Sequence, residues 1–160
     1  MTVTYEAIAS HTLVSDQTQV TFNPIASTWT DLVLVKTGGQ SSGNMTMRFN
    51  SDSGTNYSGT QVFGTGSGSG SSDRYSSQGT MYINYSNATG NSVTTIMNIM
   101  NYANTTTNKT VLLRNNDSAF YVGAYVHLWR STAAITRIDL FGSPNLLSGS
   151  TFTLYGIKAE

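Results

Sequence analysis

Apolar and polar residues alternate with a period of two along most of the chain, and Gly, Asn, Asp and Ser interrupt the alternation at intervals of about ten residues. This pattern predicts strands near residues 3–9, 18–22, 31–37, 45–49, 59–64, 79–85, 93–102, 109–115, 119–130, 135–141 and 151–158. Val, Ile, Thr, Tyr and Phe dominate these segments, as expected on a pleated surface. We therefore expect an all-β fold, an antiparallel β-sandwich that is jelly-roll-like.

One segment also fits a helix. Residues 92–102 place apolar side chains at helical spacing, but the same stretch alternates as Val93, Thr95, Met97 and Ile99. Its Thr and Asn content favours a strand, so we expect no helix of ordinary length in the chain.

The length of 160 residues suits a single β-sandwich domain over residues 1–160. Ser, Thr, Asn and Gly together make up 74 of the 160 residues, which means that hydroxyl and amide groups carry the polarity. Residues 64–78 form a Gly/Ser-rich run, which we expect to be a flexible loop inside the domain.

The charge balance excludes several kinds of partner. Eight basic and eight acidic side chains give a net charge of zero, so electrostatic attraction to nucleic acid or to a membrane surface is not expected. No stretch approaches the roughly 20 apolar residues of a membrane span. The amino-terminal residues lack the pattern of a secretory signal, and the chain has no Cys to form disulfides or thiolate metal sites.

The segment Phe120–Arg130 is apolar on both faces of the predicted strand. Even positions carry Phe, Val, Ala, Val and Leu, while the odd positions carry most of the aromatic side chains. One face of such a strand packs in the core, so the other must be covered by a neighbouring element or a second subunit. We predict that Tyr121, Tyr125, His127 and Trp129 form a homo-oligomer interface.

Catalytic groups are scarce. The chain has two His and two Glu, and it lacks a Gly-x-Ser-x-Gly elbow and a phosphate-binding loop. His127 lies within an apolar strand, where a hydrogen-bonded core or interface histidine is favoured over a general base. We expect no enzymatic activity and no cofactor.

The segment from Asn50 to Asn56 places oxygen-bearing side chains at every second position, with Asp52 in the middle. Calcium loops use this spacing, but the bidentate Glu that closes such loops is missing. The favoured alternative is a turn stabilised by side-chain hydrogen bonds to the backbone and by Gly54 at positive φ. Asn50, Asp52 and Asn56 are therefore candidates for a turn or a cation site.

Aromatic side chains are candidates for stacking on sugar rings, although rings in β domains more often pack in a core or an interface. The candidates are Trp29, Tyr57, Tyr75, Tyr82, Tyr85, Tyr102, Tyr121, Tyr125 and Trp129.

Four segments carry a resemblance to a known family. They are Thr30–Val35, Met47–Ser58, Leu128–Ile135 and Gly149–Ala159, the last with the ending Thr-Leu-Tyr-Gly-Ile-Lys. Together they resemble small β-rich structural proteins of tailed bacteriophages, many of them marine, over about residues 5–159. The resemblance implies a class of protein without catalytic residues, and it does not choose between the head and the tail of the particle.

On this basis we expect a non-enzymatic virion protein, made in the host cytoplasm. The first expectation is a capsid decoration or head-associated protein that forms a homotrimer and docks on other virion proteins such as the major capsid protein. The alternative is a tail or tail-fibre module that binds glycans of the host surface through exposed rings and the 64–78 loop. A cellular carbohydrate-binding module is a third interpretation.

Overall fold

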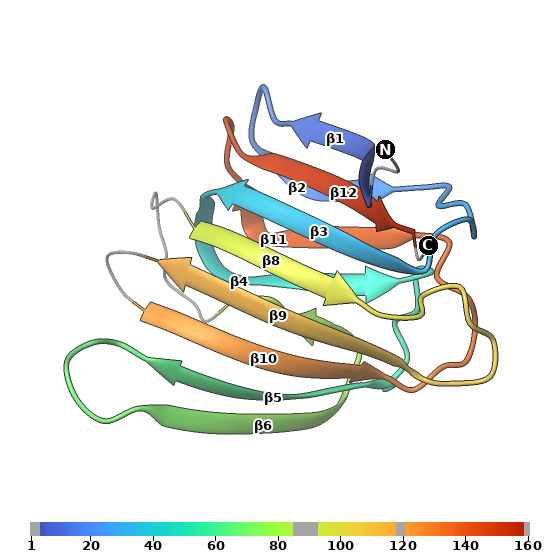
Figure 1. The fold of residues 1–160 in the computed structure, drawn as a ribbon. Coiled ribbons are helices and arrows are strands. Elements are labelled where there is room, and N and C mark those ends of the chain that lie inside the picture. Colours follow the sequence, from blue (N-terminus) through green and yellow to red (C-terminus); the bar gives the residue numbers. More distant parts are fainter. Residues whose placement is uncertain (1–3, 85–92, 118–120, 159–160) are drawn as a thin grey trace.

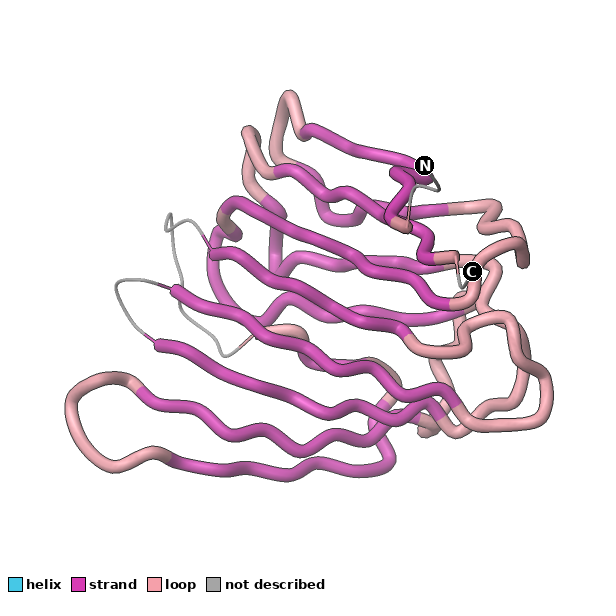
Figure 2. The backbone as a smooth tube through the Cα atoms, viewed as in Figure 1, coloured by secondary structure: helices cyan, strands magenta, loops and turns pink. Residues whose placement is uncertain are grey.

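The computed structural model describes residues 4–84, 93–117 and 121–158. These residues form strands and connecting loops without a helix (Figure 2). The strands are β1 (Tyr5–Thr12), β2 (Gln17–Phe22), β3 (Asp31–Gly38), β4 (Gln40–Phe49), β5 (Tyr57–Gly64), β6 (Ser71–Gln78), β7 (Met81–Tyr82), β8 (Val93–Ile99), β9 (Lys109–Asp117), β10 (Tyr121–Trp129), β11 (Ile138–Leu146) and β12 (Thr151–Ile157). No helix in the described part of the chain is long and apolar enough to cross a membrane.

Two antiparallel sheets of unequal size face each other (Figure 1). The long sheet has eight strands in the order β1-β12-β3-β8-β9-β10-β5-β6, and the short sheet has four in the order β2-β11-β4-β7. The predicted all-β antiparallel sandwich is thus confirmed.

The topology is that of a jelly roll with two insertions. Strands β1, β2, β3, β4, β7, β8, β11 and β12 form the two four-stranded layers β1-β12-β3-β8 and β2-β11-β4-β7. Along the chain these strands change layer at every step except from β4 to β7, which are neighbours in the short sheet. The pairs β5–β6 and β9–β10 are inserted after β4 and after β8, and both extend the first layer. The insertions therefore explain why one sheet is twice as wide as the other.

The core lies between the sheets and is made of side chains with period-two burial. In β8, for example, Val93, Thr95, Met97 and Ile99 are buried while the residues between them are not, which confirms a strand in this segment. The largest fully buried side chains include aromatic and aliphatic residues from both sheets and from the loop after β8: Phe49, Tyr57, Tyr102, Tyr125, Phe152, Leu32, Leu34, Met45, Met47 and Met81.

The Gly/Ser segment is shorter as a loop than we predicted. Residues 65–70 connect two strands, whereas Ser71–Gln78 form β6 and pair with β5 at the edge of the long sheet. The prediction of a loop up to residue 78 was wrong because an edge strand is held by its backbone hydrogen bonds. Six of the eight β6 residues are exposed, so this strand needs no apolar alternation.

A close approach between a loop and β12 gives a test of this packing. A Cβ atom on Gly156 would lie 2.1 Å from Cδ2 of Trp29, so the indole ring occupies the space of a side chain. The ring is also covered by Lys158, whose Nζ lies 4.9 Å from the ring centroid.

We expect Gly156→Ala to lower the free energy of unfolding by about 2 kcal/mol, because the methyl group must displace Trp29. The matched control is Gly68→Ala in the Gly/Ser loop, where no atom lies within 4 Å of the added Cβ. Urea denaturation followed by circular dichroism measures both variants. Equal stability of the two would show that Trp29 does not need the space above Gly156.

Candidate interaction surface

Strand β10 presents its aromatic residues to the interior. Tyr121, Tyr125, His127 and Trp129 are exposed by only 3%, 2%, 0% and 2%. The prediction that these four side chains form an oligomer interface was wrong, because they pack inside their own chain. The physical reason is that rings fill the wide space between the sheets, whereas the smaller side chains of the same strand do not.

The opposite face of β10 is the one left uncovered. Val122 is 61% exposed and Val126 is 51% exposed, and Ala124 between them is also exposed. As expected, β10 has a second apolar face that the chain does not cover. This face is formed by the aliphatic residues Val122, Ala124 and Val126 and not by the aromatic residues.

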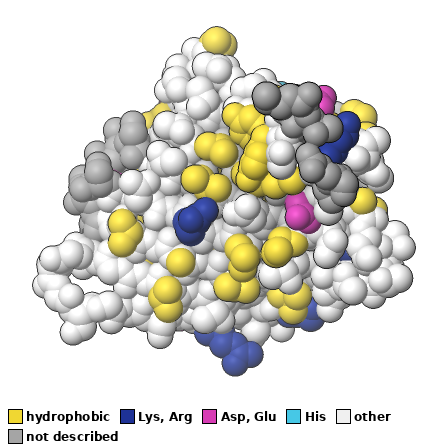
Figure 3. Space-filling view, in the orientation of Figure 1, with side chains coloured by type: hydrophobic (Ala, Val, Ile, Leu, Met, Phe, Trp, Pro, Cys, Tyr) yellow, Lys and Arg dark blue, Asp and Glu magenta, His cyan; other side chains and the backbone are white. Residues whose placement is uncertain are grey.

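Neighbouring strands of the long sheet extend this surface. Val62 of β5, Leu112 of β9 and Met100, which follows β8, are 56%, 42% and 44% exposed. We call the resulting surface the outer aliphatic face; it consists of Val62, Met100, Leu112, Val122, Ala124 and Val126. Figure 3 shows apolar side chains distributed over this side of the molecule, with few charged groups among them. Several large apolar side chains exposed on one sheet face favour an interaction site there.

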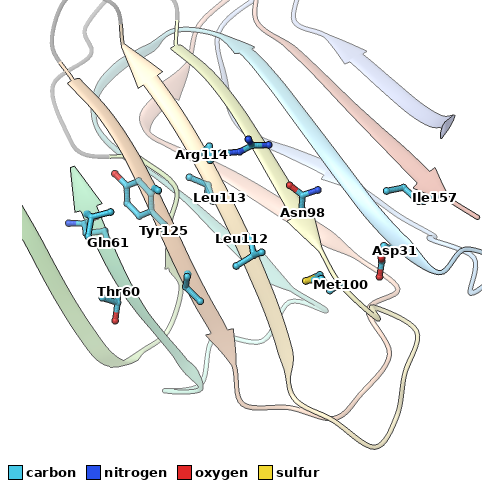
Figure 4. A pocket seen from close by; sticks show the side chains of 13 residues that line it. Asp31, Thr60, Gln61, Asn98, Met100, Leu112, Leu113, Arg114, Tyr125 and Ile157 are labelled. Atoms are coloured by element: carbon cyan, nitrogen blue, oxygen red, sulfur yellow. The ribbon is translucent and has the colours of Figure 1, made fainter. Parts of the chain in front are cut away.

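The outer aliphatic face is hollowed rather than flat. One hollow of about 560 Å³ extends from Ile157 and Asp31 across β8 and β9 to Val62 (Figure 4). A second hollow of about 790 Å³ lies beside it, between Val122 and the residues that flank the Gly/Ser loop. The two share Val62, Arg114 and Ala124 in their walls, so they adjoin each other along the sheet.

His127 is a core histidine. Its Nδ1 lies 2.6 Å from the hydroxyl of Tyr75, which also accepts a hydrogen bond from the backbone N–H of Tyr82 at 3.2 Å. The Tyr125 ring also packs against the imidazole, with ring centroids 5.7 Å apart. The Nε2 atom is buried without a partner among the described residues, and burial lowers the pKa of His127 to about 4. The side chain is therefore neutral at physiological pH.

Asp52 is the centre of a turn. Its Oδ1 accepts a hydrogen bond from the Gly54 N–H at 2.8 Å, and its Oδ2 accepts from Asn56 Nδ2 at 2.9 Å and from Trp129 Nε1 at 2.7 Å. Burial raises the pKa of the carboxyl group, but the hydrogen bonds from Trp129, Asn56 and Gly54 outweigh this effect and lower the pKa below its ordinary value. The carboxylate oxygens thus already have protein donors.

Asn50 ties the same turn to another loop. Its Nδ2 donates to the Ala134 carbonyl at 2.8 Å, and its Oδ1 accepts from the Thr136 N–H at 2.9 Å. The positive φ values occur at Asn50 (51°) and Ser51 (58°), so the expectation of positive φ at Gly54 was wrong. Among the described residues, no three His, Cys, Asp or Glu side chains are grouped as metal ligands. The contacts of Asn50, Asp52 and Asn56 are those of a turn.

We expect Asp52→Asn to lower the free energy of unfolding by about 2 kcal/mol, because the amide NH₂ would then face a donor in either orientation, the Trp129 N–H or the Gly54 N–H. Millimolar Ca²⁺ should leave the thermal midpoint of the unaltered protein unchanged. Asp73→Asn, at an exposed position of β6, is the control and should have little effect. A midpoint that rises with Ca²⁺ in the unaltered chain but not in Asp52→Asn would instead establish a cation site.

Most of the candidate sugar-stacking rings are inside the molecule. Tyr57, Tyr102, Tyr121, Tyr125 and Trp129 are at most 3% exposed. Trp29, Tyr75 and Tyr82 are half-buried, and Tyr85 lies outside the described residues. Rings buried on both sides cannot stack on a sugar, so five of the nine candidates serve packing.

Comparisons with known proteins agree with the fold and go no further. No protein-family model and no curated protein sequence matches the chain. An exo-inulinase from Aspergillus awamori is similar in structure, with a TM-score of 0.51 and 10% identity, over 96% of this chain and 29% of the inulinase chain. A protein of unknown function from Shewanella oneidensis MR-1 aligns over 98% of this chain and 80% of its own, with a TM-score of 0.23 and 8% identity, too low to support an argument. The inulinase similarity concerns the sandwich fold alone, and this chain spans less than a third of that enzyme.

The burial of His127 predicts a pH effect on stability. Between its ordinary pKa of 6.5 and the folded value of about 4, the unfolded chain binds a proton that the folded chain does not. Stability should therefore fall as the pH is lowered through this window, by up to about 1.4 kcal/mol per pH unit from this group.

We expect His127→Gln to show a shallower loss of stability between pH 6.5 and pH 4 than the unaltered chain. Urea denaturation at several pH values measures the slope, which is independent of any constant loss of stability in the variant. His11→Gln, in an exposed position of β1, controls for the removal of a histidine. An unchanged slope in His127→Gln would contradict a neutral, buried imidazole.

Proposed function

We propose that this protein is a non-enzymatic structural component of a bacteriophage virion, which assembles through the outer aliphatic face of the long sheet. The observation that carries the proposal is the exposure of Val62, Leu112, Val122 and Val126 on one hollowed sheet face. A monomer gains nothing from keeping such side chains in water, whereas an assembled particle buries them.

The fold is compatible with this role. Jelly rolls are common in viral capsid proteins and also occur in lectins, so the topology by itself is an analogy and not a function. The resemblance of four sequence segments to structural proteins of tailed phages favours the virion over other sites of assembly. A neutral, Cys-free chain rich in hydroxyl groups is also suited to a particle exposed to changing surroundings.

Within the virion, a head-associated decoration protein fits the surface better than a glycan-binding tail module. The outer aliphatic face has no aromatic side chain among the six residues that define it, and glycan recognition relies on exposed rings. Aliphatic side chains instead suit the centre of a protein–protein interface. The partners we propose are further copies of this chain and a shell protein such as the major capsid protein.

The test uses phage particles purified from the bacterium in which they multiply. In these particles we expect peptides of this chain in an amount typical of a structural protein. We also expect antibodies against the chain to label the head of the particle. Absence of the chain from purified particles would overturn the proposal. Label on the tail, together with binding of host glycans by the isolated protein, would favour the tail-module alternative.

Replacement of one central side chain tests the role of the surface. We expect Val126→Lys to reduce incorporation into particles at least about tenfold, because a lysine in the centre of an apolar interface must lose its water. Gln17→Lys, on an exposed position of β2 in the short sheet, should be incorporated normally. Circular dichroism and thermal melting establish that both variants are folded. Equal incorporation would show that the outer aliphatic face is not the surface that docks.

A further inference from the structure

Two opposite charges lie within the hollow of the outer aliphatic face. Among the residues that the structure describes, Asp31 and Arg114 are the only charged ones that line the 560 Å³ hollow. Arg114 is exposed, and its guanidinium has no ion pair or hydrogen bond with the described residues. The Oδ1 atom of Asp31 accepts a hydrogen bond from the Asn101 N–H at 2.7 Å, which fixes the carboxylate at the edge of the hollow. The Asp31 carboxylate is thus held in place, and neither Asp31 nor Arg114 forms an ion pair with the described residues.

The strand register places these two charges symmetrically about Asn98. Asn98 on β8 lies beside Val33 of β3 on one side and Leu112 of β9 on the other. Asp31 is two residues from Val33 in the direction of Met100, and Arg114 is two residues from Leu112 in the opposite direction. With strands about 4.8 Å apart and about 3.3 Å per residue, each charge lies about 8 Å from Asn98. Figure 4 shows Asn98 between Arg114 and Asp31.

We propose that a second copy of this chain docks on the outer aliphatic face around a two-fold axis that passes through Asn98 in the plane of the interface. An axis at right angles to the line from Asp31 to Arg114 sets Arg114 opposite Asp31 of the second copy, and Asp31 opposite its Arg114. The same rotation sets Asn98 against Asn98, where an amide both donates and accepts. It also sets Met100 against Leu112 of the second copy. A surface that complements itself in this way is what a two-fold dimer requires.

Other occupants fit this surface less well. An aliphatic ligand or a lipid chain in the hollow would cover Arg114 and leave its charge without a partner, which is strongly unfavourable. A second copy instead supplies a carboxylate at the position of each guanidinium. The inference rests on the proposed function, in which copies of this chain assemble with one another. It goes beyond that function because it specifies the symmetry and the contacts of the assembly.

The experiment measures mass by light scattering after size exclusion. We expect about 34 kDa for the unaltered protein, twice the 17.2 kDa of one chain. Arg114→Glu and Asp31→Arg each place like charges opposite one another in a two-fold pair. Each should raise the dissociation constant about a hundredfold or more and elute as a monomer at working concentration.

An equimolar mixture of the two variants should regain the dimer mass. In the mixed pair, Glu at position 114 of one copy meets Arg at position 31 of the other, and the native Asp31 and Arg114 meet at the second contact. Arg74→Glu makes the same charge change on an exposed residue of β6, outside the 560 Å³ hollow, and should leave the mass unchanged. Failure of the mixture to regain the dimer mass, or dimers in either variant alone, would overturn the two-fold pairing.

A second design covers the case that Asp31→Arg does not fold because the bond to Asn101 is lost. Asp31→Asn retains an oxygen acceptor for the Asn101 N–H, so the double variant Arg114→Glu/Asp31→Asn should recover dimer relative to Arg114→Glu alone. A mass near 52 kDa, three times 17.2 kDa, would replace the two-fold pair by a trimer and leave the proposed virion function standing. A monomeric protein that still enters particles would likewise overturn only the pairing.

Discussion

Aromatic side chains with hydrogen-bonding tips join the two sheets, and the rest of the structure depends on them. Phe49 of the short sheet packs edge-on against Trp129 of the long sheet, and Tyr57 stacks on the same indole, with ring centroids 5.5 and 6.3 Å from it. The Tyr57 hydroxyl accepts from the Phe49 N–H at 3.1 Å, and Trp129 donates to Asp52. A long sheet twice as wide as its partner needs such bulky groups, because four opposing strands cannot cover eight.

The orientation of β10 and the nature of the outer surface follow from this constraint. Once the rings of Tyr125, His127 and Trp129 point inwards, the alternation of a strand sends Val122, Ala124 and Val126 outwards. The outer surface is therefore aliphatic because the aromatic side chains of β10 lie in the interior. This division favours contact with another protein surface and disfavours recognition of sugars.

The strands and the alternation of buried and exposed residues along them were largely predictable, because a period of two is the direct sign of a sheet with one buried face. In β10 both faces are apolar, so the alternation identifies two faces but does not tell which of them packs inside. Which face packs inside depends on the width of the opposite sheet, and this width is a property of the whole fold. The edge strand β6 was missed because Ser71–Gln78 are held by backbone pairing with β5 and carry almost no apolar signal. The turn around Asp52 was predictable from its Asn and Asp residues, but the donation from Trp129, 77 residues away, was not.

The relation between Asp31 and Arg114 illustrates what register adds to sequence. The two residues are far apart in the chain, and only the pairing of β3, β8 and β9 places them at equal distances from Asn98. A chain with a net charge of zero has no long-range field to draw copies together, so association must rely on short-range burial of apolar surface. Apolar burial is non-directional and by itself does not select one orientation of two apolar faces. Two charges on a mainly apolar surface supply that selection, because any orientation that leaves them unpaired is penalised.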